Sequence, residues 1–209
     1  MLKKLIKYMF QSQSIQRFNM NEYLKNNIKL HGRVLDLASG RSMYSKFLKG
    51  DFIHIRADLK LKYDVDIEID FNKRFPCKDN EYDYILLLNA IYISPDPKSV
   101  LDECRRVLKR DGTMYVTFPC IFNENPEPKD YHRFTKEYIR LITAEFNEVE
   151  IIPIGNRVES ALYILDPILR LRVLKGLFLL ILLPLCNLLK FVSRGYIEYP
   201  IFYMAILKK

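Results

Sequence analysis

The sequence predicts an α/β protein whose core is a doubly wound, mostly parallel β-sheet, and two observations support this prediction. Short apolar runs alternate along the chain with segments whose apolar residues recur at helical spacing, as in repeated β-α-β units. The apolar run over residues 34–37 ends in Ala38, Ser39 and Gly40, as a buried strand does when it turns directly into a helix. Such sheets bind ligands at the carboxyl ends of their strands, so this turn is a candidate site. A core strand that merely ends in a turn is the alternative.

The elements of the first half follow in order. Residues 3–29 are expected to be helical, and residues 42–48 to form a short helix after the first strand. The second strand is predicted at 52–58 and the third at 65–69, where apolar and acidic residues alternate. Residues 82–88 are a continuous apolar run, which is typical of a central strand buried on both faces.

The second half continues the alternation. A helix is predicted over 97–108 and the fifth strand over 113–118. Thr135 is expected to cap the next helix, and strands are predicted at 148–154 and 199–207. The apolar side chains expected on the buried face of the capped helix are Tyr138, Leu141, Ile142 and Phe146.

Composition restricts the class of protein. A chain of 209 residues that is 49% hydrophobic is one domain with an elaboration, and it can bury a large core. The cysteines form neither a CxxC pair nor a Cys/His cluster, so we expect no metal site, reduced thiols and a cytoplasmic location. The cysteines are Cys77, Cys104, Cys120 and Cys186.

The net charge of +8 lies at the ends of the chain. Residues 1–32 carry six basic residues against one acidic, and residues 155–209 carry eight against three. Basic flanks suit anionic lipid or nucleic acid, but here the cations are interleaved with leucines, so we expect no nucleic-acid partner. The start, MLKKLIKYMF, is interpreted as a basic amphipathic helix because its apolar run is too short for a signal peptide.

Three carboxylates stand in or just after predicted strands: Asp36 in the first, Asp58 after the second and Asp70 after the third. Asp58 lies about 20 residues beyond the turn, where a carboxylate can accept hydrogen bonds from ribose hydroxyls. The alternative is that these acids only cap nearby helices. Because parallel strands end at one crevice, the three together indicate a site for a nucleoside-like ligand.

Four stretches in series resemble class I S-adenosylmethionine-dependent methyltransferases, and among them the type 11 group that acts on small molecules. They are VLDLASG (34–40), ADL (57–59), IDFNKRFPCKDNEYDYILLLNAIYISPDP (69–97) and ECRRVLKRDGTMYVTFP (103–119). The resemblance covers roughly residues 30–154. It implies a Rossmann-like sheet of seven strands whose last strand is antiparallel, and S-adenosylmethionine as the cofactor.

The resemblance also implies which residues hold that cofactor. The turn would approach the methionine part, and the residues after the second strand would hold the ribose. The pair after the third strand would flank the adenine, and the residue after the fourth would line the methionine end. In that order, these residues are Asp36, Ala38, Ser39 and Gly40; Asp58 and Leu59; Asp70 and Phe71; and Asn89.

The chain departs from the family pattern at two places. Where the family often has three spaced glycines, this chain has Ala38, Gly40 and Ser42, and where many members have Glu-His it has Tyr92-Ile93. The second departure leaves the substrate-side wall undefined. A dinucleotide-binding oxidoreductase is the rival on the same fold, but it needs glycines for its pyrophosphate turn, so the sequence favours the methyl donor.

Methyl transfer requires alignment and, for a hydroxyl acceptor, a general base. The candidate base is His132, in the loop after the fifth strand, with Asp130 and Arg133 beside it. The alternative is that these two neighbours only fix the loop. The segment DYHRFT (130–135) resembles a motif of enzymes in polysaccharide and cell-envelope pathways. We therefore expect O-methylation of a small-molecule or lipid-linked acceptor, with glycans among the candidates. A catalytically silent binding or scaffold protein is the alternative.

Domain organisation is predicted as a helical segment (1–32), a core (33–154 with 199–209) and an apolar insertion (155–198). The uncharged run 176–189 has 14 residues, short of the roughly 20 that span a bilayer, and cations flank it. This favours a helical hairpin at the cytoplasmic face of a membrane. A helical cap on the sheet and a dimer interface are the alternatives, and the sequence does not fix the oligomeric state.

Overall fold

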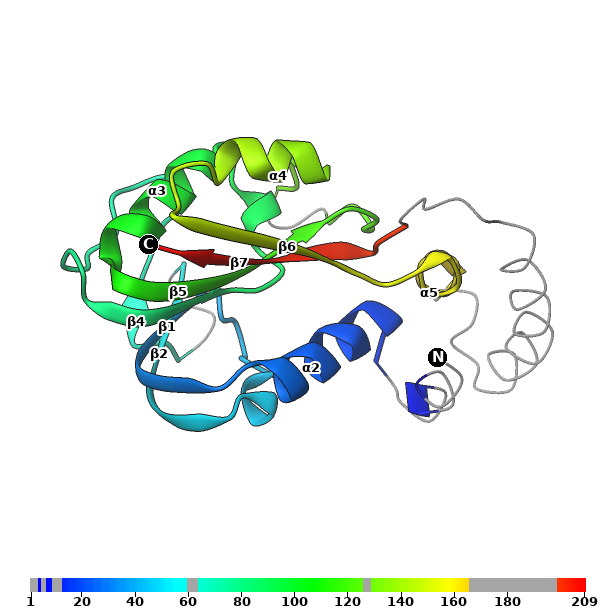
Figure 1. The fold of residues 1–209 in the computed structure, drawn as a ribbon, viewed down its shortest axis with the longest axis horizontal. Helices are drawn as coiled ribbons and strands as arrows, with labels where there is room; N and C mark the ends of the chain where they lie inside the picture. The colour runs from blue at the N-terminus through cyan, green and yellow to red at the C-terminus, as the bar shows by residue number, and fades with distance from the viewer. Residues whose placement is uncertain (1–3, 5–6, 9–12, 60–63, 126–128, 166–198) are drawn as a thin grey trace.

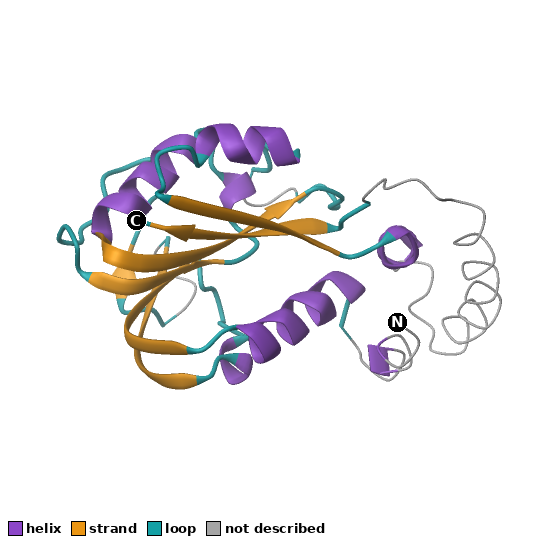
Figure 2. Cartoon of the chain, viewed as in Figure 1, coloured by secondary structure: helices purple, strands orange, loops and turns teal. Residues whose placement is uncertain are grey.

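The computed structural model describes residues 4, 7–8, 13–59, 64–125, 129–165 and 199–209. They form one seven-stranded sheet with helices on both faces (Figures 1 and 2). The strands are β1 (Leu30–Leu37), β2 (Gly50–Asp58), β3 (Ile67–Glu68), β4 (Tyr82–Leu87), β5 (Leu108–Pro119), β6 (Glu148–Ile154) and β7 (Phe202–Lys208). The helices are α2 (Ile15–Asn27), α3 (Pro97–Val107), α4 (Lys136–Ile142) and α5 (Arg157–Leu165), with short 3₁₀ helices η1 (Ser45–Phe47) and η2 (Ile91–Ile93).

The strand order is β3-β2-β1-β4-β5-β7-β6. The first five strands in this order pair in parallel, whereas β7 is antiparallel to both β5 and β6. This confirms the predicted fold class, a mostly parallel seven-stranded sheet with an antiparallel last strand.

The crevice of the fold lies where β1, β2 and β4 end. Leu37 is in register with Ala57 on one side and with Leu87 on the other, so the carboxyl ends of the three strands finish at one level. The chain order reverses between β1 and β4, which makes this edge the topological switch point at which doubly wound sheets bind their ligands.

Two apolar cores sandwich the sheet. Leu35 and Leu37 face the layer formed by α3 and α4, whereas Val34 and Leu86 face the layer formed by α2 and α5 (Figure 1). Successive side chains of a strand point to opposite faces, so a strand covered on both sides needs apolar residues at nearly every position. Asp36 follows the same alternation and therefore points toward the α2 face.

Polar caps fix where the main helices begin. The Ser14 hydroxyl accepts from the Arg17 N–H at α2, and the Asp96 carboxylate accepts from the Ser99 N–H at α3. Thr135 accepts from the N–H of Tyr138 at α4, as predicted.

The predicted buried face of α4 was partly wrong. Ile139 and Ile142 are the buried residues of this helix, Phe146 is buried just after it, and Leu141 is 69% exposed. The helix has only seven residues, and its register, set by the Thr135 cap, turns Ile139 and Ile142 toward α3. Tyr138 is 37% exposed at the edge of that face.

Other element boundaries differ from the predictions where local support is weak. The predicted helix at 42–48 is only the 3₁₀ turn η1. The predicted strand at 65–69 shortens to β3, because an edge strand pairs on one side only. The last strand begins at Phe202 rather than at residue 199.

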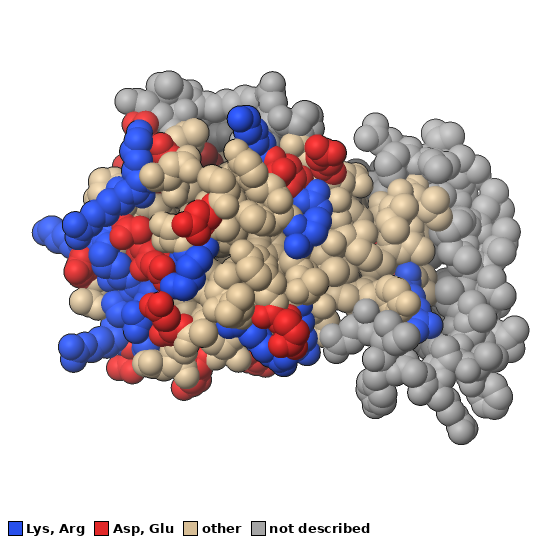
Figure 3. Space-filling view, turned by 90° about the horizontal axis from the view of Figure 1, so that it is seen from above, with Lys and Arg blue, Asp and Glu red and all other residues tan. Residues whose placement is uncertain are grey.

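The predicted apolar insertion is only partly described. Its first part forms α5, while residues 166–198, with the uncharged run 176–189, lie outside the described residues. Among the helices of the described part, none is long and apolar enough to cross a membrane. On the α3/α4 face, basic and acidic side chains intermingle without a continuous area of either sign (Figure 3).

Candidate functional site

The crevice is divided into two hollows by the turn that follows β1. The edge hollow, about 220 Å³, lies toward β2 and β3, and the helix hollow, about 630 Å³, lies toward α2. Four of the predicted cofactor residues line the edge hollow: Asp58, Leu59, Asp70 and Phe71. Three line the helix hollow: Ser39, Gly40 and Asn89. Ala38 lines both, so the structure brings eight of the nine predicted residues to one crevice.

The turn itself is held in an uncommon backbone conformation. Ala38 and Ser42 have φ values of 51° and 43°, a left-handed region that side chains other than glycine seldom adopt. The Ser39 N–H donates to the carbonyl of Ala57 at 3.1 Å, and the Gly40 N–H donates to the Asp58 carboxylate at 2.7 Å. The end of β2 therefore fixes the turn after β1, and backbone strain of this kind is concentrated at functional sites.

Asp58 stands between the turn and the edge hollow. Its second oxygen accepts from the Leu59 N–H at 2.8 Å, so each oxygen already has one backbone donor. A carboxylate has about four acceptor positions, which leaves Asp58 able to accept from a ligand hydroxyl. Its ribose-binding role stays a prediction.

Asp70 is held ionised on the far side of the edge hollow. It accepts from the backbone N–H and the side-chain amide of Asn72, at 2.9 and 3.0 Å. The Asn72 N–H and then Lys73 lower the pKa of this carboxyl. The ring centroid of Phe71, the next residue, lies 6.2 Å from that of Phe75. A hydrogen-bond acceptor and an aromatic side chain therefore lie together on one wall of the edge hollow.

Asp36 is the predicted cofactor residue that lines neither hollow. It is fully buried and accepts hydrogen bonds from the hydroxyls of Ser42 and Tyr44 and faces Nε2 of His54 at 2.8 Å. Burial, and then the Asp36 charge, raise the pKa of Tyr44 well above its usual value, so Tyr44 stays protonated and donates. The geometry gives Asp36 the role of positioning the loop that walls the helix hollow.

The helix hollow also contains residues that the sequence did not single out. Gln13, Arg17, Met20 and Asn21, in and just before α2, line it opposite the turn. The Gln16 amide donates to the Asn89 side-chain oxygen at 2.7 Å, which ties α2 to the end of β4. The sequence does contain a run of amide side chains in this helix. Their burial, however, depends on how α2 packs in the folded protein, so the sequence alone does not indicate it.

The loop after β5 is held by an ion pair. Arg133 donates to both oxygens of Asp130, at 2.6 and 2.8 Å, and to the carbonyls of Phe122 and Asn123. Its guanidinium also lies 5.9 Å from the ring of Tyr92. These contacts agree with the alternative noted for the sequence, in which Asp130 and Arg133 fix the loop.

His132 lies beside the crevice rather than in it. Its Nε2 is 3.4 Å from the Pro95 carbonyl, and its ring centroid is 5.5 Å from that of Phe134. Pro95 and the neighbouring Tyr131 both line the edge hollow, but His132 lines neither hollow. Its catalytic role therefore remains a prediction. The Tyr92 hydroxyl, at one of the departures from the family pattern, accepts from the Asn125 amide and braces the same loop.

Acid is expected to weaken the loop through Asp130. Hydrogen bonds from Arg133 lower the pKa of this carboxyl. Its contribution to stability is therefore complete above the unfolded pKa of about 3.9 and is lost as the pH falls through the lower, folded pKa. Between about pH 5 and pH 2, the wild type should lose more free energy of unfolding than Asp130→Asn, measured by urea unfolding. Asp51→Asn, at an exposed position, is the control. Parallel acid profiles for the wild type and Asp130→Asn would contradict this role.

Part of the chain is similar to known methyltransferases. Residues 35–116 match the family model of a methyltransferase domain. An uncharacterized protein of Methanocaldococcus jannaschii is 28% identical over 99 residues, and the match covers 46% of this chain and 48% of that protein. The matched region therefore spans about half the length of this curated relative.

Solved structures show the same fold at low sequence identity. An S-adenosylmethionine-dependent methyltransferase of Thermotoga maritima aligns with a TM-score of 0.58 and 15% identity, over 93% of this chain and 91% of that chain. Phosphoethanolamine N-methyltransferase 2 of Haemonchus contortus, in complex with S-adenosyl-L-methionine, aligns with a TM-score of 0.58 and 15% identity, over 91% and 52%. The family model confirms the resemblance found in the sequence, and the solved structures confirm the fold class.

Proposed function

We propose that this chain transfers a methyl group from S-adenosylmethionine to a small-molecule or lipid-linked acceptor. Residues 35–116 match a methyltransferase domain, and a solved S-adenosylmethionine-dependent methyltransferase shares the fold. The observation that carries the proposal is the crevice itself. Asp58 and Asp70 present carboxylates at the ends of β2 and β3, beside a turn held close to the opening.

The residues present fit this cofactor. Asp58 would accept from the ribose hydroxyls, Asp70 from the adenine amine, and the turn at Ser39 would lie against the methionine part. Within the part of the chain that the structure describes, the Ser39 hydroxyl and the Asn21 side-chain oxygen are buried without a hydrogen-bond partner. Both residues line the helix hollow, so polar groups of a ligand there would satisfy atoms that the protein leaves unpaired.

The chain's contribution to transfer would be mainly alignment. When bound, S-adenosylmethionine supplies a methyl group activated by a positively charged sulfur. The protein has to hold an acceptor in line with that bond and exclude water, and alignment of this kind can lower a barrier by about 7–11 kcal/mol. Asn89, with a φ of 56° and its N–H on the Thr117 hydroxyl at 2.6 Å, is a rigid wall beside this position.

We further propose O-methylation, with His132 taking the proton of an acceptor hydroxyl. The support is positional, because His132 follows Tyr131 at the rim of the edge hollow. Reaching the acceptor would require this loop to shift when substrate binds. An unchanged transfer rate in His132→Gln would contradict the role.

A membrane-borne acceptor is supported by the sequence of the insertion. The uncharged run 176–189 is flanked by cations, a composition that suits the interface of an anionic membrane. The acceptor would then be a lipid-linked molecule, with a glycan as one candidate, and the protein would be peripheral on the cytoplasmic face.

Flotation with vesicles tests the membrane proposal. The full chain should float with anionic vesicles at low salt and less at moderate salt, because screening weakens surface attraction. Replacing Leu179 and Leu180 with aspartate should reduce flotation at least severalfold, since charges are costly in an apolar interface. Leu141→Asp, at an exposed apolar position on α4, is the matched control. A chain that stays out of the vesicle fraction at both salt concentrations would refute the proposal.

The alternative function is a catalytically silent binding or scaffold protein on the same fold. Ala38, Ser42 and the pair Tyr92-Ile93, which depart from the family pattern, motivate it. Calorimetric titration with S-adenosylmethionine separates the two functions. Saturable binding is expected, followed by transfer of labelled methyl groups into a lipid or small-molecule extract, whereas a protein that does not bind the donor would be a scaffold.

A further inference from the structure

The helix hollow is lined by three cationic side chains. Arg17 comes from α2, and Arg41 and Lys46 come from the segment between β1 and β2. All three side chains are exposed at this opening. Among the described residues, no aspartate or glutamate lines the helix hollow beside them.

These three cations differ from several other cations of the described part of the fold, which form ion pairs with carboxylates. Lys98, Arg106 and Arg133 each form close ion pairs with carboxylates. Within the described ranges, no ion pair involves Arg17, Arg41 or Lys46. Lys46 has one neighbour of note, the ring of Phe47 at 5.3 Å.

The carboxylate nearest to Arg41 in the sequence is Asp36, and it does not pair with these cations at the opening. Asp36 lies beneath the loop, fully buried, and both of its oxygens are occupied by Ser42, Tyr44 and His54. Like charges gathered around a concave surface raise the local concentration of anions, so the helix hollow is an attractive site for a negatively charged group.

The methyl donor can account for only part of this charge. S-adenosylmethionine carries one carboxylate together with a sulfonium and an ammonium group. It can therefore pair with at most one of the three cations while adding positive charge of its own. The other two cations are then available to bind a second anionic group in the crevice. The acceptor is the second ligand of the proposed reaction, so it would supply that group.

We infer that the acceptor bears a phosphate group, which binds in the helix hollow against Arg17, Arg41 and Lys46. The inference rests on the proposed methyl transfer and specifies its substrate class. Arginine forks match phosphate oxygens in pairs, and a phosphate monoester carries about two negative charges where a carboxylate carries one. Anchored in this way, a neighbouring nucleophile of the acceptor is held beside the turn at Gly40. A lipid-linked and a soluble phosphate ester share this chemistry.

Anion binding to the donor-loaded full chain tests the inference. The protein is saturated with S-adenosylhomocysteine and titrated with inorganic pyrophosphate in a calorimeter at moderate salt. Saturable binding is expected, and Arg17→Gln and Arg41→Gln should each weaken it about tenfold, because each removes a charge-assisted contact. Acetate should bind at least tenfold more weakly than pyrophosphate. Arg110→Gln, an exposed cation at the start of β5, should bind pyrophosphate like the wild type.

Two competitors separate the sources of the phosphate. A short isoprenyl phosphate represents a lipid-linked acceptor and glucose 1-phosphate a soluble one, and displacement of pyrophosphate by either supports the site. Displacement by neither overturns the inference, as does equal pyrophosphate affinity in the wild type, Arg17→Gln and Arg41→Gln. The loading step separately tests binding at the cofactor site, on which the proposed methyl transfer depends. If S-adenosylhomocysteine does not bind but pyrophosphate still depends on Arg17 and Arg41, the anion site stands and the proposed activity fails.

Discussion

Replacing Asp58 with alanine is expected to weaken S-adenosylmethionine binding by about 100-fold or more. Two ribose hydroxyls donating to one carboxylate make two charge-assisted hydrogen bonds, each worth about 1.5–3 kcal/mol, and about 1.4 kcal/mol corresponds to a tenfold change in affinity. The substitution also removes the acceptor of the Gly40 and Leu59 N–H groups, which loosens the turn. Both effects act in the same direction, and calorimetric titration measures their sum.

Two variants separate these effects. Asp58→Asn keeps one carbonyl oxygen and the shape of the side chain, so it should hold the turn in part and show an intermediate loss of affinity. Asp51→Ala removes an exposed carboxylate at the opposite end of β2 and should leave donor binding unchanged. Wild-type affinity in Asp58→Ala would exclude the ribose role, whatever the effect on thermal stability.

The sheet was predictable because burial on both faces leaves a direct record in the sequence. The carboxyl-terminal parts of β1 and β4 are covered by helices on both faces, so most of their residues are apolar and short apolar runs result. The same topology brings strand ends to one level, which is why Asp58 and Asp70 could be assigned to one crevice from their positions alone. These predictions depend on local pattern and on a general property of parallel sheets.

The remainder of the site depends on how helices pack, which local pattern does not determine. Asp36 was predicted to contact the cofactor, but its side chain points to the α2 face and is covered there. Arg17 and Asn21 reach the helix hollow only because α2 packs beside η1, on the other side of the hollow from the turn after β1. The buried face of α4 was partly misassigned for a related reason, since Leu141 is apolar but lies on the exposed side of a short helix.

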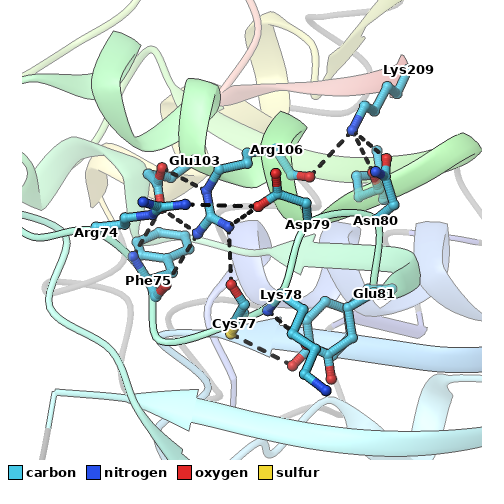
Figure 4. Close-up of polar contacts among 12 residues, drawn as sticks. Arg74, Phe75, Cys77, Lys78, Asp79, Asn80, Glu81, Glu103, Arg106 and Lys209 are labelled. Carbon is cyan, nitrogen blue, oxygen red and sulfur yellow. Dashed lines mark hydrogen bonds and ion pairs between the residues drawn. The ribbon is translucent and has the colours of Figure 1, made fainter.

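The stretch RVLKRDG (106–112) contributed to the resemblance, and the structure explains its first residue. Arg106 donates to both oxygens of Glu103, to Asp79 and to the carbonyls of Phe75 and Cys77 (Figure 4). The side chain of Arg106 is 17% exposed. One guanidinium therefore satisfies several acceptors of the segment before β4, two of them in partly buried contacts, and joins that segment to the end of α3.

Arg106→Ala is accordingly expected to lower the free energy of unfolding by about 3 kcal/mol, because removing one partner of a largely buried ion pair leaves its acceptors uncompensated. For a chain of this size, the melting temperature should fall by about 6–12 °C. Lys209 remains bound to the Arg106 carbonyl, a backbone group that the substitution keeps, so the loss measures the guanidinium itself.

Arg110→Ala is the matched control, since this exposed arginine stands four residues away and should change the melting temperature little. Because Arg106 lies at the end of β4 and β5 opposite the crevice, S-adenosylmethionine should bind the folded variant as tightly as the wild type. Equal melting temperatures for Arg106→Ala and Arg110→Ala would mean that the network of Figure 4 adds nothing to stability.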